Sequence, residues 1–284
     1  MNHLDCMSTT SAVTAGAEIN VNAESIRHHY DSLSFWYRLF WGDHLHHGWF
    51  NTGTEKAREA QIAMLWQCTS ILRIPIAARV LDVGCGYGAT GMFLASELAC
   101  QVDGLNVSPN QLMVAKKKVA ASKFSANIHL RLGDAESFAY PADHYDIVWT
   151  MESSEHFADK QKYFHQVRRT LRRDGRLLLA AWTGSMAHYR VCRVAKHFVC
   201  PELCTADEYV GFIETAGMRV QKLVNATSYV VPTWQICLGR VKRFGLLKRF
   251  VSHEVRSFAD GLETILDAYS SGEMKYTIIA ADRT

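Results

Sequence analysis

Residues 79–92 read R-V-L-D-V-G-C-G-Y-G-A-T-G-M, an apolar run that ends in an acid and a cluster of glycines. The apolar residues are typical of a buried strand in a parallel sheet. Gly84 and Gly86 lack the Cβ atoms that would keep a ligand away from the backbone. A helix is expected to begin near Ala89, with its N-terminal N–H groups turned towards the glycines. Because open α/β sheets bind ligands outside the carboxyl ends of their strands, the stretch predicts an α/β fold with a ligand-binding turn.

The glycines alone do not identify the ligand, because Gly84, Gly86 and Ala89 also satisfy the dinucleotide pattern G-x-G-x-x-G/A. Asp82 and Gly88 complete a second pattern, D-x-G-x-G-x-G, which resembles the first motif of class I S-adenosylmethionine-dependent methyltransferases. The resemblance implies a doubly wound, Rossmann-like sheet that binds S-adenosyl-L-methionine and releases S-adenosyl-L-homocysteine. It also implies cofactor contacts at Asp82, which would hold the methionine end, and at Gly84, Cys85 and Gly86.

The composition describes a globular chain. With 284 residues, 48% of them hydrophobic and 21% charged, it can bury one core of doubly wound size and keep residues for a cover. The formal net charge of +3 is too balanced to predict a nucleic-acid groove, and no nucleic-acid-binding signature is present. The 8 cysteines lie scattered in apolar contexts, without the dense spacing of a secreted disulfide scaffold. We therefore expect reduced thiols and a cytoplasmic protein.

Two groups of potential metal ligands lack a metal-binding pattern. The histidines within residues 28–47 contain no H-E-x-x-H arrangement, and the histidines and cysteines of residues 188–204 match no zinc spacing. No metal site is therefore expected in the protein itself, and Mg²⁺ is expected only if the acceptor is a diphosphate. The oligomeric state is not predicted.

No apolar segment reaches membrane-spanning length. Residues 1–22 have neither the basic start nor the apolar core of a secretory signal, so a disordered tail is expected there. Residues 240–251, R-V-K-R-F-G-L-L-K-R-F-V, alternate basic and apolar side chains. They are compatible with a solvated basic face, with a peripheral contact at a membrane surface, or with a clamp on a diphosphate.

Residues 23–75 are predicted to form a helical cover rich in aromatic side chains. These rings can fill the core, or they can close as a lid over the cofactor's sulfonium cation, which aromatic faces attract. Residues 30–48 read Y-D-x-x-S-x-x-Y-x-x-x-W-G-D-H-x-H-H-G. They resemble the tocopherol methyltransferase branch, related to sterol and prenyl-diphosphate C-methyltransferases and cyclopropane fatty acid synthases. The resemblance implies that Tyr30, His47, Gly48 and Trp49 close over the cofactor.

Residues 76–184 are predicted to form the cofactor-binding core. A second strand ends at Asn106, where a nicotinamide enzyme generally has an acid, and Ser108 followed by proline is typical of a helix start. This segment resembles the methyltransferase pattern in which Asn106 and Gln111 hold the ribose, next to Val107. A third strand over residues 127–132 precedes Asp134, Ala135 and Glu136, which the resemblance places beside the adenine. The alternative for Asp134 is an acid in a solvated turn.

A fourth strand over residues 145–151 is predicted to deliver E-S-S-E-H-F to the rim of the site. From Met151 the segment resembles the M-E-S-G-E-H motif of the tocopherol branch, with Ser154 in place of glycine. The resemblance assigns Met151 to the cofactor site, and Glu152, Glu155 and His156 to catalysis. These groups could act as base for a phenol or enol, or could stabilise and deprotonate a carbocation left by methylation of an alkene. Glu155 could equally orient a helix N-terminus.

A fifth strand is predicted over residues 176–182, after a D-G turn. Residues 185–284 are then predicted to supply helices on the acceptor side and the closing strands of the core. An inserted helical lid, residues 231–272, comes before the last strand.

Together the resemblances predict methyl transfer to a small, largely apolar natural product, either tocopherol- or quinol-like, a terpenoid or an alkaloid, with methylation of carbon favoured. The alternative enzyme is a prenyl-diphosphate or sterol C-methyltransferase, with or without cyclisation after methylation. The non-enzymatic alternative is a nucleoside-binding protein on the same fold, against which Asp82, Gly86 and Glu152 argue.

Overall fold

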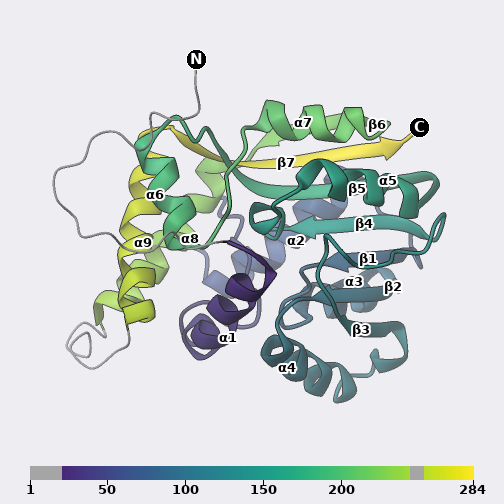
Figure 1. Cartoon of the computed structure of the whole chain (residues 1–284). Helices are drawn as coiled ribbons and strands as arrows, with labels where there is room; N and C mark the ends of the chain where they lie inside the picture. Colours follow the sequence, from purple (N-terminus) through teal and green to yellow (C-terminus); the bar gives the residue numbers. More distant parts are fainter. Residues whose placement is uncertain (1–20, 244–252) are drawn as a thin grey trace.

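A computed structural model describes residues 21–243 and 253–284 of the chain. Within this part lies a 7-stranded sheet in the order β3-β2-β1-β4-β5-β7-β6. The strands are β1 (Arg79–Val83), β2 (Gln101–Asn106), β3 (Ile128–Leu132), β4 (Tyr145–Met151), β5 (Leu171–Gly184), β6 (Met218–Asn225) and β7 (Met274–Arg283). β1 to β5 pair in parallel, and β7 runs antiparallel between β5 and β6 (Figure 1). The predicted doubly wound sheet is confirmed.

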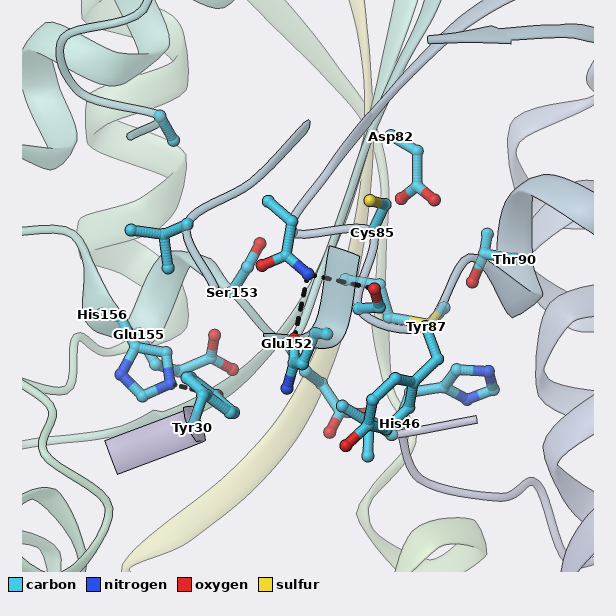
Figure 2. Close-up of a pocket in the computed structure, with 18 of the residues that line it drawn as sticks. Tyr30, His46, Asp82, Cys85, Tyr87, Thr90, Glu152, Ser153, Glu155 and His156 are labelled. Atoms are coloured by element: carbon cyan, nitrogen blue, oxygen red, sulfur yellow. Dashed lines mark hydrogen bonds between the residues drawn. The ribbon is translucent and has the colours of Figure 1, made fainter. Parts of the chain in front are cut away.

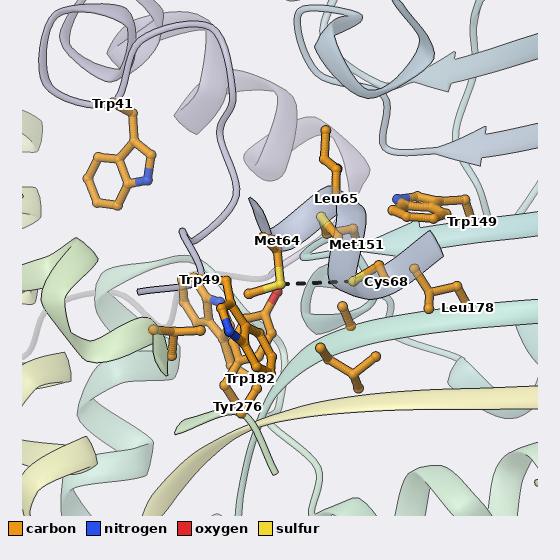
Figure 3. Packing of buried hydrophobic residues seen from close by; sticks show 14 of the residues in the cluster. Trp41, Trp49, Met64, Leu65, Cys68, Trp149, Met151, Leu178, Trp182 and Tyr276 are labelled. Atoms are coloured by element: carbon orange, nitrogen blue, oxygen red, sulfur yellow. Dashed lines mark hydrogen bonds between the residues drawn. The ribbon is translucent and has the colours of Figure 1, made fainter. Parts of the chain in front are cut away.

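Two apolar cores lie on the two faces of the sheet, because successive residues of each central strand point to opposite sides. Val80 belongs to one core and Leu81 to the other. The first core is covered by α2 (Ala57–Leu72) and α3 (Ala89–Leu98), and Figure 3 shows Met64 of α2 in this cluster with Trp149 of β4. The second core is covered by α5 (Lys160–Thr170) and α7 (Ala206–Thr215).

Local capping fixes where the helices begin. The Ser108 side chain accepts the backbone N–H of Gln111, and proline is the first residue of α4 (Pro109–Ala120), as the sequence predicts. Thr205 caps α7 in the same way, and Glu208 returns a hydrogen bond to the cap residue. These caps fix the first residues of α4 and α7.

Four further helices form a cover over the carboxyl ends of the parallel strands (Figure 1). They are α1 (Ala23–Phe40), α6 (Tyr189–His197), α8 (Thr227–Arg243) and α9 (His253–Ser270). The last two lie between β6 and β7 in the chain, where the sequence predicts an inserted helical lid. No helix within residues 21–243 and 253–284 is long and apolar enough to cross a membrane.

Two boundaries differ clearly from the sequence predictions. β5 begins at Leu171 rather than at residue 176, because Leu171 pairs with Tyr145 ahead of a register shift. α8 begins at Thr227 rather than at residue 231, and Pro232 lies inside the helix. Of the basic segment 240–251, residues 244–251 lie outside the described residues. Lys242 forms an ion pair with Glu263 at 3.2 Å, so this cation already has a partner within the lid.

Candidate active site

A cavity opens at the carboxyl ends of β1 and β4, beneath α1. Asp31 of α1 accepts a hydrogen bond from the hydroxyl of Ser108, which fixes the helix against the start of α4. Figure 2 shows Asp82 on one side of the cavity and the Tyr30–His156 pair on another. The predicted site residues that line it are Tyr30, Asp82, Gly84, Cys85, Gly86, Asn106, Val107, Gln111, Asp134, Ala135, Glu136, Met151, Glu152, Glu155 and His156.

The glycine turn after β1 takes a backbone form that favours glycine. Gly84 has φ +80° and Gly86 has φ +51°. A Cβ atom on Gly84 would lie 2.5 Å from the Cβ of Ser153, which itself follows β4 and donates its hydroxyl to the carbonyl of Val83 at 2.9 Å. Glycine at position 84 therefore lets the turns after β1 and β4 approach each other.

Asp82 presents a buried acceptor without a partner. Its side chain is 3% exposed, its Oδ2 has no hydrogen-bond partner among the described residues, and burial raises the pKa of its carboxyl to about 7. A cation that entered the cavity would supply the missing partner. This arrangement fits the ammonium group of an amino-acid moiety such as the methionine end of S-adenosylmethionine.

Gln111 presents the complementary feature, a buried donor. Its Oε1 accepts from Asn106 Nδ2 at 3.0 Å, whereas its Nε2 has no partner among the described residues. Both amide hydrogens of Asn106 are in use, since its Nδ2 also donates to the carbonyl of Gly86 at 3.0 Å. The amide of Gln111 can therefore donate to a ligand hydroxyl such as that of a ribose, while Asn106 shapes the turn.

Two acids near the predicted adenine position, Asp134 and Glu136, accept hydrogen bonds from backbone N–H groups. Asp134 Oδ1 accepts the backbone N–H of Glu136 at 3.0 Å. The carboxylate of Glu136 accepts the backbone N–H groups of Ala158 at 3.1 Å and Asp159 at 2.6 Å. Glu136 thus joins the loop after β3 to the start of α5, and both acids still line the cavity.

Part of the histidine-rich segment does not line the cavity. His47, Gly48 and Trp49 are not among the residues that line the cavity, whereas the preceding residues 43–46 are. Trp49 stacks on Tyr229 with ring centroids 3.9 Å apart, and a Cβ on Gly48 would lie 2.6 Å from the Cβ of Ala60. They pack against α2 and α8, and their assignment to the cofactor site remains a prediction.

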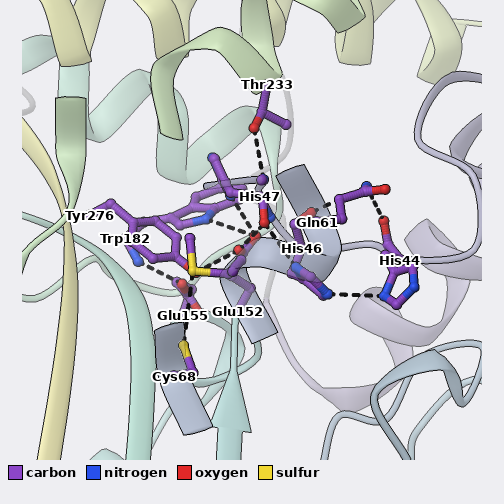
Figure 4. Close-up of polar contacts among 12 residues, drawn as sticks. His44, His46, His47, Gln61, Cys68, Glu152, Glu155, Trp182, Thr233 and Tyr276 are labelled. Atoms are coloured by element: carbon purple, nitrogen blue, oxygen red, sulfur yellow. Dashed lines mark hydrogen bonds and ion pairs between the residues drawn. The ribbon is translucent and has the colours of Figure 1, made fainter. Parts of the chain in front are cut away.

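The carboxylate of Glu152 is held by four donors from three other parts of the chain (Figure 4). It accepts from His47 N at 2.8 Å and from His47 Nδ1 at 2.8 Å. Trp182 Nε1 donates at 3.3 Å and the hydroxyl of Tyr276 at 2.7 Å. Burial favours the neutral form of Glu152, but the charge and hydrogen bonds of His47 outweigh it and lower the pKa. An ionised, fully bonded carboxylate is suited to holding the site together rather than to taking a proton.

His156 is a neutral imidazole whose one ring lone pair is engaged by Tyr30. Burial lowers its pKa to about 4. Its Nδ1 lies 3.1 Å from the carbonyl of Val199, which can only accept, so Nδ1 carries the hydrogen. Nε2 is then an acceptor, and the hydroxyl of Tyr30 donates to it at 2.7 Å. An unprotonated ring nitrogen, hydrogen-bonded to the Tyr30 hydroxyl, therefore lies at the cavity wall.

Glu155 lies beside His156 in the opposite protonation state to Glu152. Its Oε1 accepts the backbone N–H of Trp182 at 2.7 Å, and its Oε2 is buried without a partner among the described residues. Burial raises the pKa of Glu155 to about 8, so the group is mostly protonated at neutral pH. The two acids of the E-S-S-E motif therefore have different chemistry.

The rest of the cavity wall is aromatic, and its charged side chains are acidic. Tyr37 and Trp41 come from the predicted aromatic cover, and the rings that sequence reasoning did not place are Tyr87, Phe157, Trp182, Phe198 and Trp234. Among the described lining residues the charged side chains besides histidine are Asp43, Asp82, Asp134, Glu136, Glu152 and Glu155, with no lysine or arginine. No group of three or more metal-ligating side chains was found within residues 21–243 and 253–284.

The strand order, the glycine turn and the buried acid at the end of β1 define a class I S-adenosylmethionine-dependent methyltransferase. More narrowly, the chain belongs to the mycolic acid cyclopropane synthetase family, whose model matches residues 18–216.

Named relatives support this placement. Tocopherol O-methyltransferase of Arabidopsis thaliana is 25% identical over 285 residues, covering 92% of this chain and 82% of the relative. Two solved structures share the fold. Mycolic acid cyclopropane synthase CmaA1, complexed with SAH and CTAB, has a TM-score of 0.83 at 22% identity, with 94% of this chain and 100% of that chain covered. Geranyl diphosphate C-methyltransferase from Streptomyces coelicolor A3(2), complexed with Mg²⁺, geranyl diphosphate and S-adenosyl-L-homocysteine, has a TM-score of 0.74 at 17% identity, covering 94% and 100%.

Proposed function

We propose that the protein transfers a methyl group from S-adenosylmethionine to a small, largely apolar and uncharged natural-product acceptor, with methylation of carbon favoured. The observation that carries the proposal is the unprotonated Nε2 of His156, which faces a cavity that also contains the unpartnered carboxylate of Asp82. Aromatic walls suit an apolar acceptor of the tocopherol, quinol, terpenoid or alkaloid kind. The names of the tocopherol relative and of the cyclopropane synthase structure support an apolar acceptor.

In this proposal the cofactor supplies an electrophilic methyl group on a sulfonium centre. Asp82 holds the ammonium group and Gln111 donates to the ribose, as their unpartnered polar atoms allow. The aromatic rings exclude water and hold the acceptor, and in-line placement of the reacting atoms accounts for most of the rate. Glu152 keeps the N-terminal segment, β5 and β7 together around the cavity.

His156 is the proposed general base. A proton leaving a phenol, an enol or a methylated carbon would pass to Nε2, either directly or through the hydroxyl of Tyr30. Because the ring is buried and neutral, Nε2 holds no proton at physiological pH, and the low pKa favours prompt release of the proton that it takes up. Of the three residues that the resemblance assigns to catalysis, this proposal makes His156 the base and gives Glu152 a structural role.

We expect His156→Gln to lower turnover by roughly 100-fold, the usual contribution of a positioned base. Its affinity for S-adenosylhomocysteine should stay within about threefold of wild type, because the groups proposed to bind the ammonium and ribose lie in other segments. Single-turnover rates and calorimetry measure the two quantities. Tyr30→Phe is the matched variant and should give a smaller loss. Normal turnover in His156→Gln would place the base elsewhere.

The prenyl-diphosphate alternative is disfavoured by charge. A diphosphate in a protein site needs arginine, lysine or a metal ion beside it. The charged or basic side chains among the described lining residues are all acids and histidines. The fold relative that binds geranyl diphosphate was crystallised with Mg²⁺. A neutral acceptor avoids this repulsion.

We therefore expect farnesol to be methylated with a kcat/KM at least about tenfold higher than farnesyl diphosphate, an energy difference of about 1.4 kcal/mol. Mass spectrometry of the products, with and without Mg²⁺, measures both. A preference for the diphosphate would overturn the uncharged-acceptor proposal and favour the alternative enzyme. The acceptors to be tested are a pool of prenols, quinols, sterols and alkaloids. If none of them leads to formation of S-adenosylhomocysteine, the non-enzymatic alternative gains support.

A further inference from the structure

Lys160 is a buried lysine at an unfavourable position. It is the first residue of α5 and is 2% exposed. Lysine is almost never fully buried unless its charge is paired, and the N-terminal end of a helix is the positive end of its dipole. Burial and the helix dipole therefore both disfavour an ammonium group here. A residue that breaks local rules in this way is frequently retained for function.

The Lys160 side chain joins two segments of the active site. Its Nζ donates to the carbonyl of Phe157 at 2.7 Å and to the carbonyl of Glu202 at 3.2 Å. Phe157 directly follows His156. Glu202 belongs to the stretch after α6 that contains Val199, whose carbonyl accepts from His156 Nδ1. Lys160 thus bridges the two pieces of backbone that set the orientation of the imidazole ring.

We propose that Lys160 is a positioning residue, which keeps His156 with Nδ1 on Val199 and Nε2 towards Tyr30 and the cavity. Its importance for turnover rests on the proposed role of His156 as the base. The positioning itself does not, because the contacts exist whether or not His156 takes a proton. Nothing in this role requires Lys160 to touch the acceptor or the cofactor.

The charge of Lys160 adds to the effect of its hydrogen bonds. Burial is the main cause of the low pKa of His156, and the nearby ammonium group lowers it further. The same charge opposes the rise in the pKa of Glu155. The other titratable groups around His156 are Tyr30 and His29 of α1 and Cys200. Of the groups around the ring, Lys160 is the one whose positive charge directly opposes protonation of His156.

Nuclear magnetic resonance of ¹⁵N-histidine-labelled protein tests the proposal, with the His156 signals assigned by their loss in His156→Gln. In wild type we expect the neutral, Nδ1-protonated form from pH 5 to 8. In Lys160→Met we expect a mixture of tautomers and a His156 pKa raised by about one unit or more. Lys160→Gln removes the charge but keeps an N–H donor, so it should share the rise in pKa while retaining more of the Nδ1 tautomer.

Lys162→Met is the matched control, because Lys162 is exposed on the same helix turn. It should leave both the tautomer and the titration of His156 unchanged. A folded Lys160→Met or Lys160→Gln protein with wild-type tautomer and titration would overturn the proposal. So would a wild-type ring that titrates at an ordinary histidine pKa, even if neither variant folded. Since the measurement needs neither cofactor nor acceptor, its outcome is independent of whether the proposed methyl transfer is correct.

Discussion

Replacing Asp82 by asparagine is expected to weaken the binding of S-adenosylhomocysteine by about 100-fold, because the variant removes one partner of a buried ion pair. The ligand-free variant should remain folded, and at alkaline pH it should be more stable than the wild-type protein. The reason is that Asp82 is buried without a partner for its Oδ2, so its ionised form is held at a cost until a cation arrives. Calorimetric titration measures the affinity.

The stability difference should depend on pH with a definite sign. The pKa of Asp82 is about 7 in the folded protein, against a reference value of 3.8. The folded state therefore binds more protons between these values, and wild-type stability falls as pH rises through this window. The melting temperature of Asp82→Asn should exceed that of wild type by a margin that grows from pH 5 to pH 8.

Asp103→Asn is the matched control, because Asp103 is also a buried acid at a central strand but accepts from Tyr145 at 2.9 Å. It should lose stability and keep its affinity for the ligand. An Asp82→Asn protein that binds S-adenosylhomocysteine as wild type does would remove Asp82 from the cofactor site.

Glu152→Gln is expected to lower the free energy of unfolding by about 3 kcal/mol or more, the usual cost of breaking a buried ion pair. The substitution replaces an acceptor of four hydrogen bonds with an amide that turns a donor towards one or more of His47, Trp182 and Tyr276. Urea denaturation at neutral pH measures the loss.

Tyr276→Phe provides the scale for that measurement, since it removes only one donor and should cost about 1 kcal/mol. Turnover of Glu152→Gln should fall with the loss of folded, correctly assembled protein. If the variant instead unfolds as wild type does and yet loses its turnover, Glu152 acts in the reaction and not as a structural clamp.

The sequence predicts best where one local rule decides the outcome. The bounds of β4, Tyr145–Met151, agree with the prediction because a buried apolar strand is followed by polar residues. Ser108 caps α4 as expected, since a cap depends on a few adjacent residues. The glycine turn is likewise predictable because the positive φ angles at Gly84 and Gly86 favour glycine, although the close approach of Ser153 to Gly84 is decided by a distant segment.

Prediction fails where distant segments decide. Residues 43–49 have no regular periodicity, so nothing local indicates that His46 faces the cavity while His47 faces Glu152. The same holds for the two acids of the E-S-S-E motif. Four donors keep Glu152 charged and burial keeps Glu155 neutral, and these donors come from segments far away in the sequence. Nothing in the sequence indicates that Lys160 is buried, because a lysine near the start of a helix is ordinarily exposed.

The position of β7 has a consequence for the order in which the molecule is made. A ribosome completes β6 well before residues 274–283, yet among the described strands β6 pairs only with β7, which also brings Tyr276 to Glu152. During translation the five parallel strands, β1 to β5, can pair before β7 has been made. β7 is the strand that lies between β5 and β6 in the finished sheet. Completion of the sheet, and of the hydrogen bonds around Glu152, is therefore a late event of biosynthesis, and a newly made chain leaves the edge of β5 unpaired until then.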